Sequence, residues 1–139
     1  MTKAISFIKF ILYGMAFALY AVVCPAQLHY TIVGNGKQIR NGDVLYLVHK
    51  IKDKVIVDST IANNNKFSFT GTVPEAVRAT LYRNENPMWI DYAHESLDIY
   101  LESGTIQINS QDRLKNAVID GTPLNETLQQ LHLINKSII

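Results

Sequence analysis

Apolar and polar side chains alternate along most of the chain between Leu28 and Asp120. The apolar residues recur at every second position in short runs, and Asn, Gly, Asp and Pro separate one run from the next. This alternation is typical of strands that bury one face and expose the other. Roughly eight strands at a spacing of about ten residues predict a mainly β fold, either an antiparallel β-sandwich or a partly open barrel.

Single positions within the pattern predict where side chains point and where the chain turns. Phe67 and Phe69 alternate with polar residues, so both rings are expected on the core side of one strand. Gly34-Asn35-Gly36 and Asn41-Gly42-Asp43 are each predicted to form a turn, because Asn and Gly tolerate left-handed backbone.

After Gly121 the spacing of apolar residues changes to that of a helix. Thr122 is suited to cap this helix and Pro123 to occupy its first position. One face is predicted to carry Leu124, Leu128, Leu131, Ile134 and Ile138. Because no capping glycine follows and the chain ends on Ile138 and Ile139, we expect a truncated lead into a missing downstream domain. The alternative is an amphipathic helix whose last turn docks on the sheet.

The first 26 residues have the layout of a secretory signal peptide: Lys3 and Lys9, then an apolar run of 14 residues from Phe10 to Val23. That run is shorter than the roughly 20 residues of a membrane-spanning helix. We expect cleavage after Ala26 and a location in the periplasm or cell envelope. In the alternative, Cys24 carries a lipid and the protein is a lipoprotein. The expected organisation is a signal peptide at 1–26, a β-rich domain at 27–121 and the helix at 122–139.

Composition excludes several classes of function. Thirteen Lys and Arg against twelve Asp and Glu give a formal charge of +1, so the basic excess that nucleic-acid binding requires is missing. The single cysteine excludes an intrachain disulfide, a four-thiolate zinc site and a C-x-x-C redox pair.

Asp58 is the strongest candidate for catalysis, because an apolar strand delivers it to Ser59 and Thr60 as in aspartic proteases. Those enzymes follow the Asp and Ser or Thr with a glycine so that two carboxylates can share a proton. Thr60 stands at the glycine position and is a poor substitute in a tight turn. We therefore expect Asp58 to lie at the end of a strand and to hydrogen-bond nearby backbone amides instead.

Motifs for metals and cofactors are incomplete. His94-Glu95 is followed by Asp98 where a zinc motif would place a second histidine, and the four histidines show no paired spacing. Gly34-x-Gly36 puts Ile39 at the position of the third glycine of a dinucleotide fingerprint. No catalytic, cofactor-binding or metal-binding residue is therefore predicted, and the chain is not expected to be an enzyme.

Two further sets of residues are predicted to be structural or incidental. The glycosylation triplets at Asn125 and Asn135 lie inside the predicted helix, and we discount them. The aromatic residues Tyr82, Trp89 and Tyr92 are expected to form a structural patch and not a binding surface.

Several segments together resemble a known family. They are Val57-Asp58-Ser59-Thr60, Lys66-Phe67-Ser68-Phe69-Thr70-Gly71, Tyr100 to Ile108 and Ile119-Asp120-Gly121-Thr122-Pro123-Leu124-Asn125. They are similar to the DUF4369 domain, the N-terminal accessory domain of Bacteroidota thiol-disulfide oxidoreductases of the TlpA and ResA type. The resemblance implies a β-rich exported domain with no catalytic residues of its own, and no cofactor.

Three functions follow as expectations. The first is a non-catalytic accessory or interaction domain of the cell envelope that packs against a thioredoxin-like domain, or presents a sheet face to an envelope protein or glycan. It would meet the membrane only through the signal segment or a lipid on Cys24. The alternative is part of a thiol-disulfide oxidoreductase whose thioredoxin domain is absent from this chain. A small hydrolase using Asp58 is a third, weaker hypothesis.

Overall fold

The computed structural model describes residues 26–138, so the predicted signal peptide, apart from Ala26, lies outside the described residues. Within 26–138 the chain forms eight strands, one short 3₁₀ turn and one α-helix. In chain order these are β1 (Leu28–Gly36), β2 (Val44–Ile51), β3 (Lys54–Ile61), β4 (Lys66–Val73), β5 (Val77–Arg83), β6 (Ser96–Leu101), β7 (Gly104–Ser110), η2 (Leu114–Asn116), β8 (Val118–Asp120) and α2 (Pro123–Ile138).

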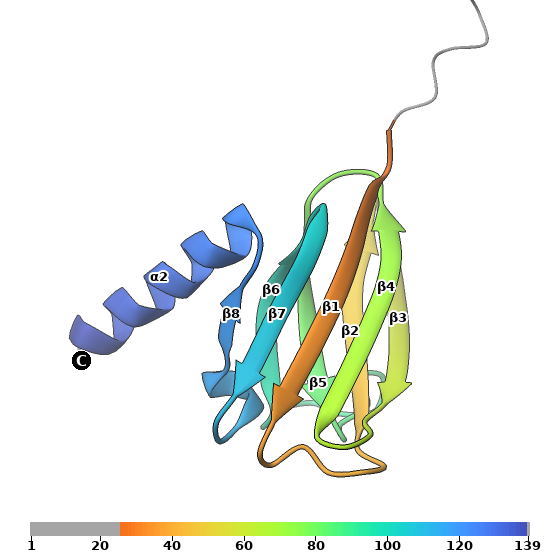
Figure 1. The fold of residues 1–139 in the computed structure, drawn as a ribbon. Helices are drawn as coiled ribbons and strands as arrows, with labels where there is room; N and C mark the ends of the chain where they lie inside the picture. Colours follow the sequence, from red (N-terminus) through yellow and green to blue (C-terminus); the bar gives the residue numbers. More distant parts are fainter. Residues whose placement is uncertain (1–25, 139) are drawn as a thin grey trace, which may run out of the picture.

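The strands form two four-stranded sheets that pack face to face, with α2 beside them (Figure 1). The strand orders are β4-β1-β7-β8 and β3-β2-β5-β6. This arrangement confirms the prediction of a mainly β sandwich followed by a helix. One pairing departs from the antiparallel pattern, because β1 and β7 run parallel, with Ile32 opposite Ile106. Alternation within each strand carries no information on the direction of its partner.

The core lies between the two sheets and is built from the alternate residues of each strand. Phe67 and Phe69 are both buried on the inner face of β4, as predicted, with their rings in an edge-on arrangement. Fully buried aliphatic side chains fill the remaining volume; the largest are Ile32, Leu45, Leu47, Leu81, Ile99, Leu101, Ile106, Ile108, Leu114 and Ile119.

One of the two predicted turns is wrong. Gly34 and Gly36 lie inside β1, and Gly34 is opposite Phe67 in the register of β1 with β4. A glycine inside a strand often marks a place where a neighbouring group comes close to the backbone, and Gly34 has this role next to Phe67. The turn at Asn41-Gly42-Asp43 is confirmed: Gly42 has φ +89°, and the Asp43 N–H donates to the Arg40 carbonyl at 3.1 Å.

Helix α2 begins at Pro123 as predicted, but a remote side chain caps it. Thr122 is at the N-cap position, where its carbonyl accepts from the Glu126 N–H at 2.9 Å. The free N–H groups of Leu124 and Asn125 donate to the Glu102 carboxylate, at 2.8 and 3.3 Å. A carboxylate near the helix N-terminus also complements the helix dipole.

The side of α2 that contacts the sandwich is polar at its centre. Asn125 is completely buried, and its amide pairs with both backbone groups of Tyr100 on the edge strand β6, donating and accepting at 2.8 Å. Gln129 accepts from the Ile119 N–H on β8 at 3.0 Å. These two amides therefore cover edges of both sheets, which would otherwise leave backbone groups unpaired.

Candidate functional site

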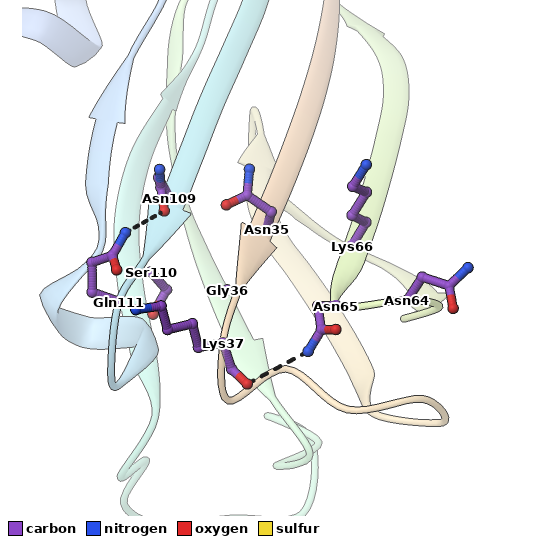
Figure 2. A pocket seen from close by; sticks show the side chains of 9 residues that line it. All are labelled: Asn35, Gly36, Lys37, Asn64, Asn65, Lys66, Asn109, Ser110 and Gln111. Atoms are coloured by element: carbon purple, nitrogen blue, oxygen red, sulfur yellow. Dashed lines mark hydrogen bonds between the residues drawn. The ribbon is translucent and has the colours of Figure 1, made fainter.

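The candidate site lies at the end of the sandwich where β1 and β7 finish and β4 begins, the lower end in Figure 1. Asn109, Asn35 and Lys66 are register partners on β7, β1 and β4. All three residues face away from the core, because the positions that alternate with them are buried. Figure 2 shows them as a row across the three strands.

A tight turn closes one side of this row. Asn64 and Asn65 have left-handed backbone, with φ 52° and 64°, which Asn tolerates better than most residues. The Asn65 amide donates to the carbonyl of Ile39 at 2.7 Å, and the Asn65 carbonyl accepts from the Gly36 N–H at 3.0 Å. These bonds tie the β3–β4 turn to the β1–β2 loop.

The other side is formed by the end of β7, by Gln111 after it and by Lys37 after β1. The Lys37 N–H donates to the Ser110 carbonyl at 3.3 Å, and the Gln111 amide donates to the Asn109 side-chain oxygen at 3.2 Å (Figure 2). Residues 35–37, 64–66 and 109–111 surround an open hollow of about 470 Å³. It is lined by Asn35, Gly36, Lys37, Asn64, Asn65, Lys66, Asn109, Ser110 and Gln111.

The lining of the hollow is polar and carries positive charge without negative charge. Five of its nine residues are Asn or Gln, and none is Asp or Glu. Within residues 26–138, Lys37 and Lys66 take part in no salt bridge. Carboxamides both donate and accept hydrogen bonds, whereas an ammonium group only donates. The hollow can therefore bind a polar ligand that carries hydroxyls and an anionic group.

An ion pair with little solvent access supports the loop that supplies Lys37. Arg83 Nε donates to Asp43 Oδ2 at 2.9 Å, with side chains only 14% and 12% exposed. Another guanidinium nitrogen of Arg83 donates to the Gln38 carbonyl at 2.6 Å. Arg83 therefore joins the end of β5 to the β1–β2 loop.

The pKa of Asp43 reports the balance of forces at this ion pair. Burial, the largest effect, raises the pKa of Asp43, and three hydrogen bonds oppose it. Their donors are the Arg40 N–H, the Asn84 amide and the Arg83 guanidinium. These bonds and the Arg83 charge outweigh burial, so the pKa of Asp43 lies below its ordinary value.

Asp58 lies on β3 and is exposed. Its carboxylate accepts from the backbone N–H of Ser59 at 2.8 Å, which is the structural role expected of Asp58. The residue lies within β3, however, and not at the end of the strand. The negative charge of Asp58 also acts on two buried neighbours, Tyr30 and His49. Burial has the larger effect on Tyr30 and raises its pKa, and the charge of Asp58 raises it further.

His49 is a buried titratable group that the sequence analysis missed. It is 6% exposed, and its Nδ1 has no hydrogen-bond partner among the described residues. Burial lowers the pKa of His49, while Asp58 partly opposes this. The signal was available, because His49 follows Leu45 and Leu47 on the inward-facing positions of β2.

The residues weighed as metal ligands do not converge. Glu95 accepts from Arg113 Nε at 3.1 Å and from the Leu114 N–H at 2.9 Å, and Asp98 binds Arg78 at 2.6 Å. In the described part of the chain no group of three His, Cys, Asp or Glu side chains is placed to hold a metal ion.

The aromatic residues and the glycosylation triplets differ from expectation in informative ways. Trp89 and Tyr92 are 84% and 75% exposed in the β5–β6 loop, so the predicted structural patch is wrong for these two. Asn125 is buried with its amide bonded to Tyr100, so folding leaves no access to that triplet. Asn135 is exposed on α2.

No helix in residues 26–138 is long and apolar enough to cross a membrane.

Comparisons with known proteins identify the family of this chain. The comparison with curated proteins finds no match to this chain. The family model described as "Domain of unknown function (DUF4369)" matches residues 30–128, which is nearly all of the sandwich and the first turns of α2. The chain therefore belongs to the DUF4369 family.

Proposed function

We propose that this protein is an exported, non-catalytic interaction domain of the cell envelope, and that the free side of α2 is its contact with a partner protein. The observation that carries the proposal is the exposure of the apolar residues of α2. Ile134 and Ile138 are 54% and 77% exposed, and Leu131 and Leu133 are also more than half exposed. Neighbouring exposed apolar residues mark protein contacts more often than scattered single ones.

The way α2 is attached supports this role. The helix contacts the sandwich through Asn125, Leu128 and Gln129, whereas its other apolar residues are exposed. Figure 1 shows its second half leading away from the sheets. Its first turn is held by Glu102 and by the Asn125–Tyr100 pairing. A partner would therefore meet a helix that is already ordered, which lowers the entropic cost of binding.

The proposed partner is a thioredoxin-like domain. The resemblance described above supports this choice, because it implies an accessory domain that accompanies a thioredoxin-like domain. The partner would supply the thiol pair, because this chain has a single cysteine. In the alternative form of the proposal, the chain is one part of a thiol-disulfide oxidoreductase and supports that reaction only when joined to the partner.

Export is proposed from the first 26 residues, with Lys3 and Lys9 ahead of the apolar run. Cell fractionation followed by intact-mass measurement tests it. A mature chain that begins at Gln27 in the envelope fraction supports cleavage, and a lipid-modified mass on Cys24 supports the lipoprotein alternative. A full-length chain in the cytoplasm contradicts export.

A photo-crosslinking residue at Ile134 tests the contact in the native cells, with Lys136, an exposed polar residue on the opposite side of the same helix, as the control. We expect a crosslinked product from Ile134 and little from Lys136, and we expect the partner to contain a thioredoxin-like domain. A partner without that domain overturns the oxidoreductase association alone. Equal or absent crosslinking at the two positions overturns the role of α2.

A further inference from the structure

We propose that the hollow at the ends of β1, β4 and β7 binds an acidic oligosaccharide. This site is separate from the free side of α2, and it stands or falls independently of the function proposed above. The assignment rests on the kind of groups that line the hollow, on their arrangement in a row, on uncompensated positive charge and on the bonds that hold the lining in place.

The lining matches a ligand with many hydroxyls. Five carboxamides and one serine hydroxyl surround the hollow, and groups of both kinds can donate as well as accept hydrogen bonds. Sugar hydroxyls have the same double character. The side-chain amides of Asn35 and Asn64 make no hydrogen bond within residues 26–138, so both are available to a ligand.

The row of Asn109, Asn35 and Lys66 suits an extended ligand. These residues are register partners on three neighbouring strands. Strands lie about 4.8 Å apart, so the row extends roughly 10 Å across the sheet. One saccharide chain laid across the strands could meet all three side chains in turn (Figure 2).

The two lysines favour an anionic sugar over a neutral one. Lys37 and Lys66 line the same hollow, and its lining contains no carboxylate to neutralise them. The chain as a whole carries a formal charge of only +1, so this positive charge is a local feature. Hydrogen bonds from an ammonium group to a carboxylate are stronger than those between neutral groups.

The lining is held in position before any ligand binds. Asn65 is fixed by its bond to the Ile39 carbonyl at 2.7 Å, and Asn109 by the Gln111 amide at 3.2 Å. The loop that carries Lys37 is held by Arg83, which donates to the Gln38 carbonyl at 2.6 Å. Prior ordering of this kind reduces the cost of binding.

Other ligand classes fit less well. Single-stranded nucleic acids rely on aromatic side chains for base stacking, and the lining of this hollow contains none. An apolar ligand would leave the amides and lysines without partners, which costs free energy. An acidic peptide could use the lysines but offers fewer hydroxyls to the amides, so it is the competing outcome of the test.

Titration of the ¹⁵N-labelled protein, followed by NMR, tests the proposal. The probe is an oligogalacturonate, with a neutral oligogalactoside and an oligoglutamate of the same length as comparisons. We expect saturable shifts in residues 35–37, 64–66 and 109–111 with the oligogalacturonate, weaker binding of the neutral sugar, and weaker binding of the peptide. Because a charge pair contributes, added salt should weaken the binding.

Variants give the test its specificity. Lys66→Gln should weaken oligogalacturonate binding about threefold and reduce its advantage over the neutral sugar. Asn35→Ala with Asn109→Ala should weaken binding about tenfold. Lys50→Gln is the matched control, because Lys50 is an exposed strand lysine that does not line the hollow. Thermal unfolding checks that each variant is folded.

Three results would overturn the assignment. They are shifts that do not saturate or that fall outside the three segments, equal weakening by Lys50→Gln and Lys66→Gln, and oligoglutamate binding as tightly as the oligogalacturonate. The last result would show that the site recognises negative charge and does not distinguish a sugar from a peptide.

Discussion

The ring of Phe67 lies against the backbone of Gly34, its partner on the neighbouring strand. A Cβ atom at Gly34 would be 2.0 Å from Cζ of Phe67, closer than any contact that atoms tolerate. The same arrangement recurs further along these two strands with the roles exchanged, because a Cβ at Gly71 would be 2.5 Å from the Tyr30 hydroxyl oxygen. Each strand therefore supplies one aromatic ring and one glycine that makes room for the other's ring.

Substitution of Gly34 tests this packing. Gly34→Ala should lower the free energy of unfolding by about 3 kcal/mol, because the new methyl group forces the Phe67 ring out of a close-packed core. Urea denaturation measures the change. Ser68→Ala, at an exposed position on β4, is the control and should change stability by less than about 0.5 kcal/mol. If Phe67→Leu does not recover part of the loss in the double variant, the ring is not the cause.

Asn125 is predicted to stabilise the attachment of α2. Asn125→Ala removes both bonds to the Tyr100 backbone and should cost about 2 kcal/mol, since a partly buried N–H and carbonyl lose their partner. Hydrogen exchange of the Tyr100 amide should become faster. Asn135→Ala on the exposed side of the same helix should leave both measurements unchanged. An Asn125 variant of normal stability would contradict this role.

The Asp43–Arg83 pair should contribute far more than the exposed pair Arg78–Asp98. Arg83→Gln leaves the carboxylate of Asp43 without its cation and should lower stability by about 3 kcal/mol. Arg78→Gln breaks a pair whose side chains are largely exposed and should cost less than about 1 kcal/mol. Thermal denaturation of the two variants compares them. Equal losses would mean that burial does not set the strength of the pair.

His49 is predicted to make stability depend on pH. Burial holds the pKa of His49 below its ordinary value of 6.5, so the unfolded chain takes up a proton before the folded chain does. The contribution of His49 to stability should therefore be constant above pH 6.5 and should fall as the pH drops below it, as far as the folded pKa. Urea midpoints between pH 8 and about pH 5 measure this.

A variant separates His49 from the other titrating groups. The charge of Asp58 acts on both His49 and Tyr30. Burial raises the pKa of Tyr30 above its ordinary value of 10, far from the range between pH 5 and 6.5. Asp43 acts at lower pH: its pKa is below 3.8, so its contribution is present above that value and is lost as the pH falls through the folded pKa. His49→Leu should remove the decline below pH 6.5. If stability still declines below pH 6.5 in this variant, another titratable group is the cause.

The number of strands and the start of the helix could be predicted from the sequence because both depend on local order. The period of two buries one face of each strand, and Pro123 is favoured at the first helical position whatever its surroundings. The placement of Phe67 and Phe69 in the core follows from the same period. Alternation did not identify Gly34 as a strand residue, because its cause is a ring that lies 33 positions later in the chain.

Tertiary structure alone decided the pairings and the candidate sites. The hollow is assembled from three segments, at 35–37, 64–66 and 109–111, that become neighbours only when β1 pairs with β4 on one side and runs parallel to β7 on the other. In the sequence, Asn125 is recognisable only as part of a chance glycosylation triplet. Its structural role depends on its contact with Tyr100 on an edge strand. Local sequence determines which residues face inward, because that depends on backbone periodicity. Which groups then meet depends on contacts between distant segments, and these are set by the packing of the whole chain.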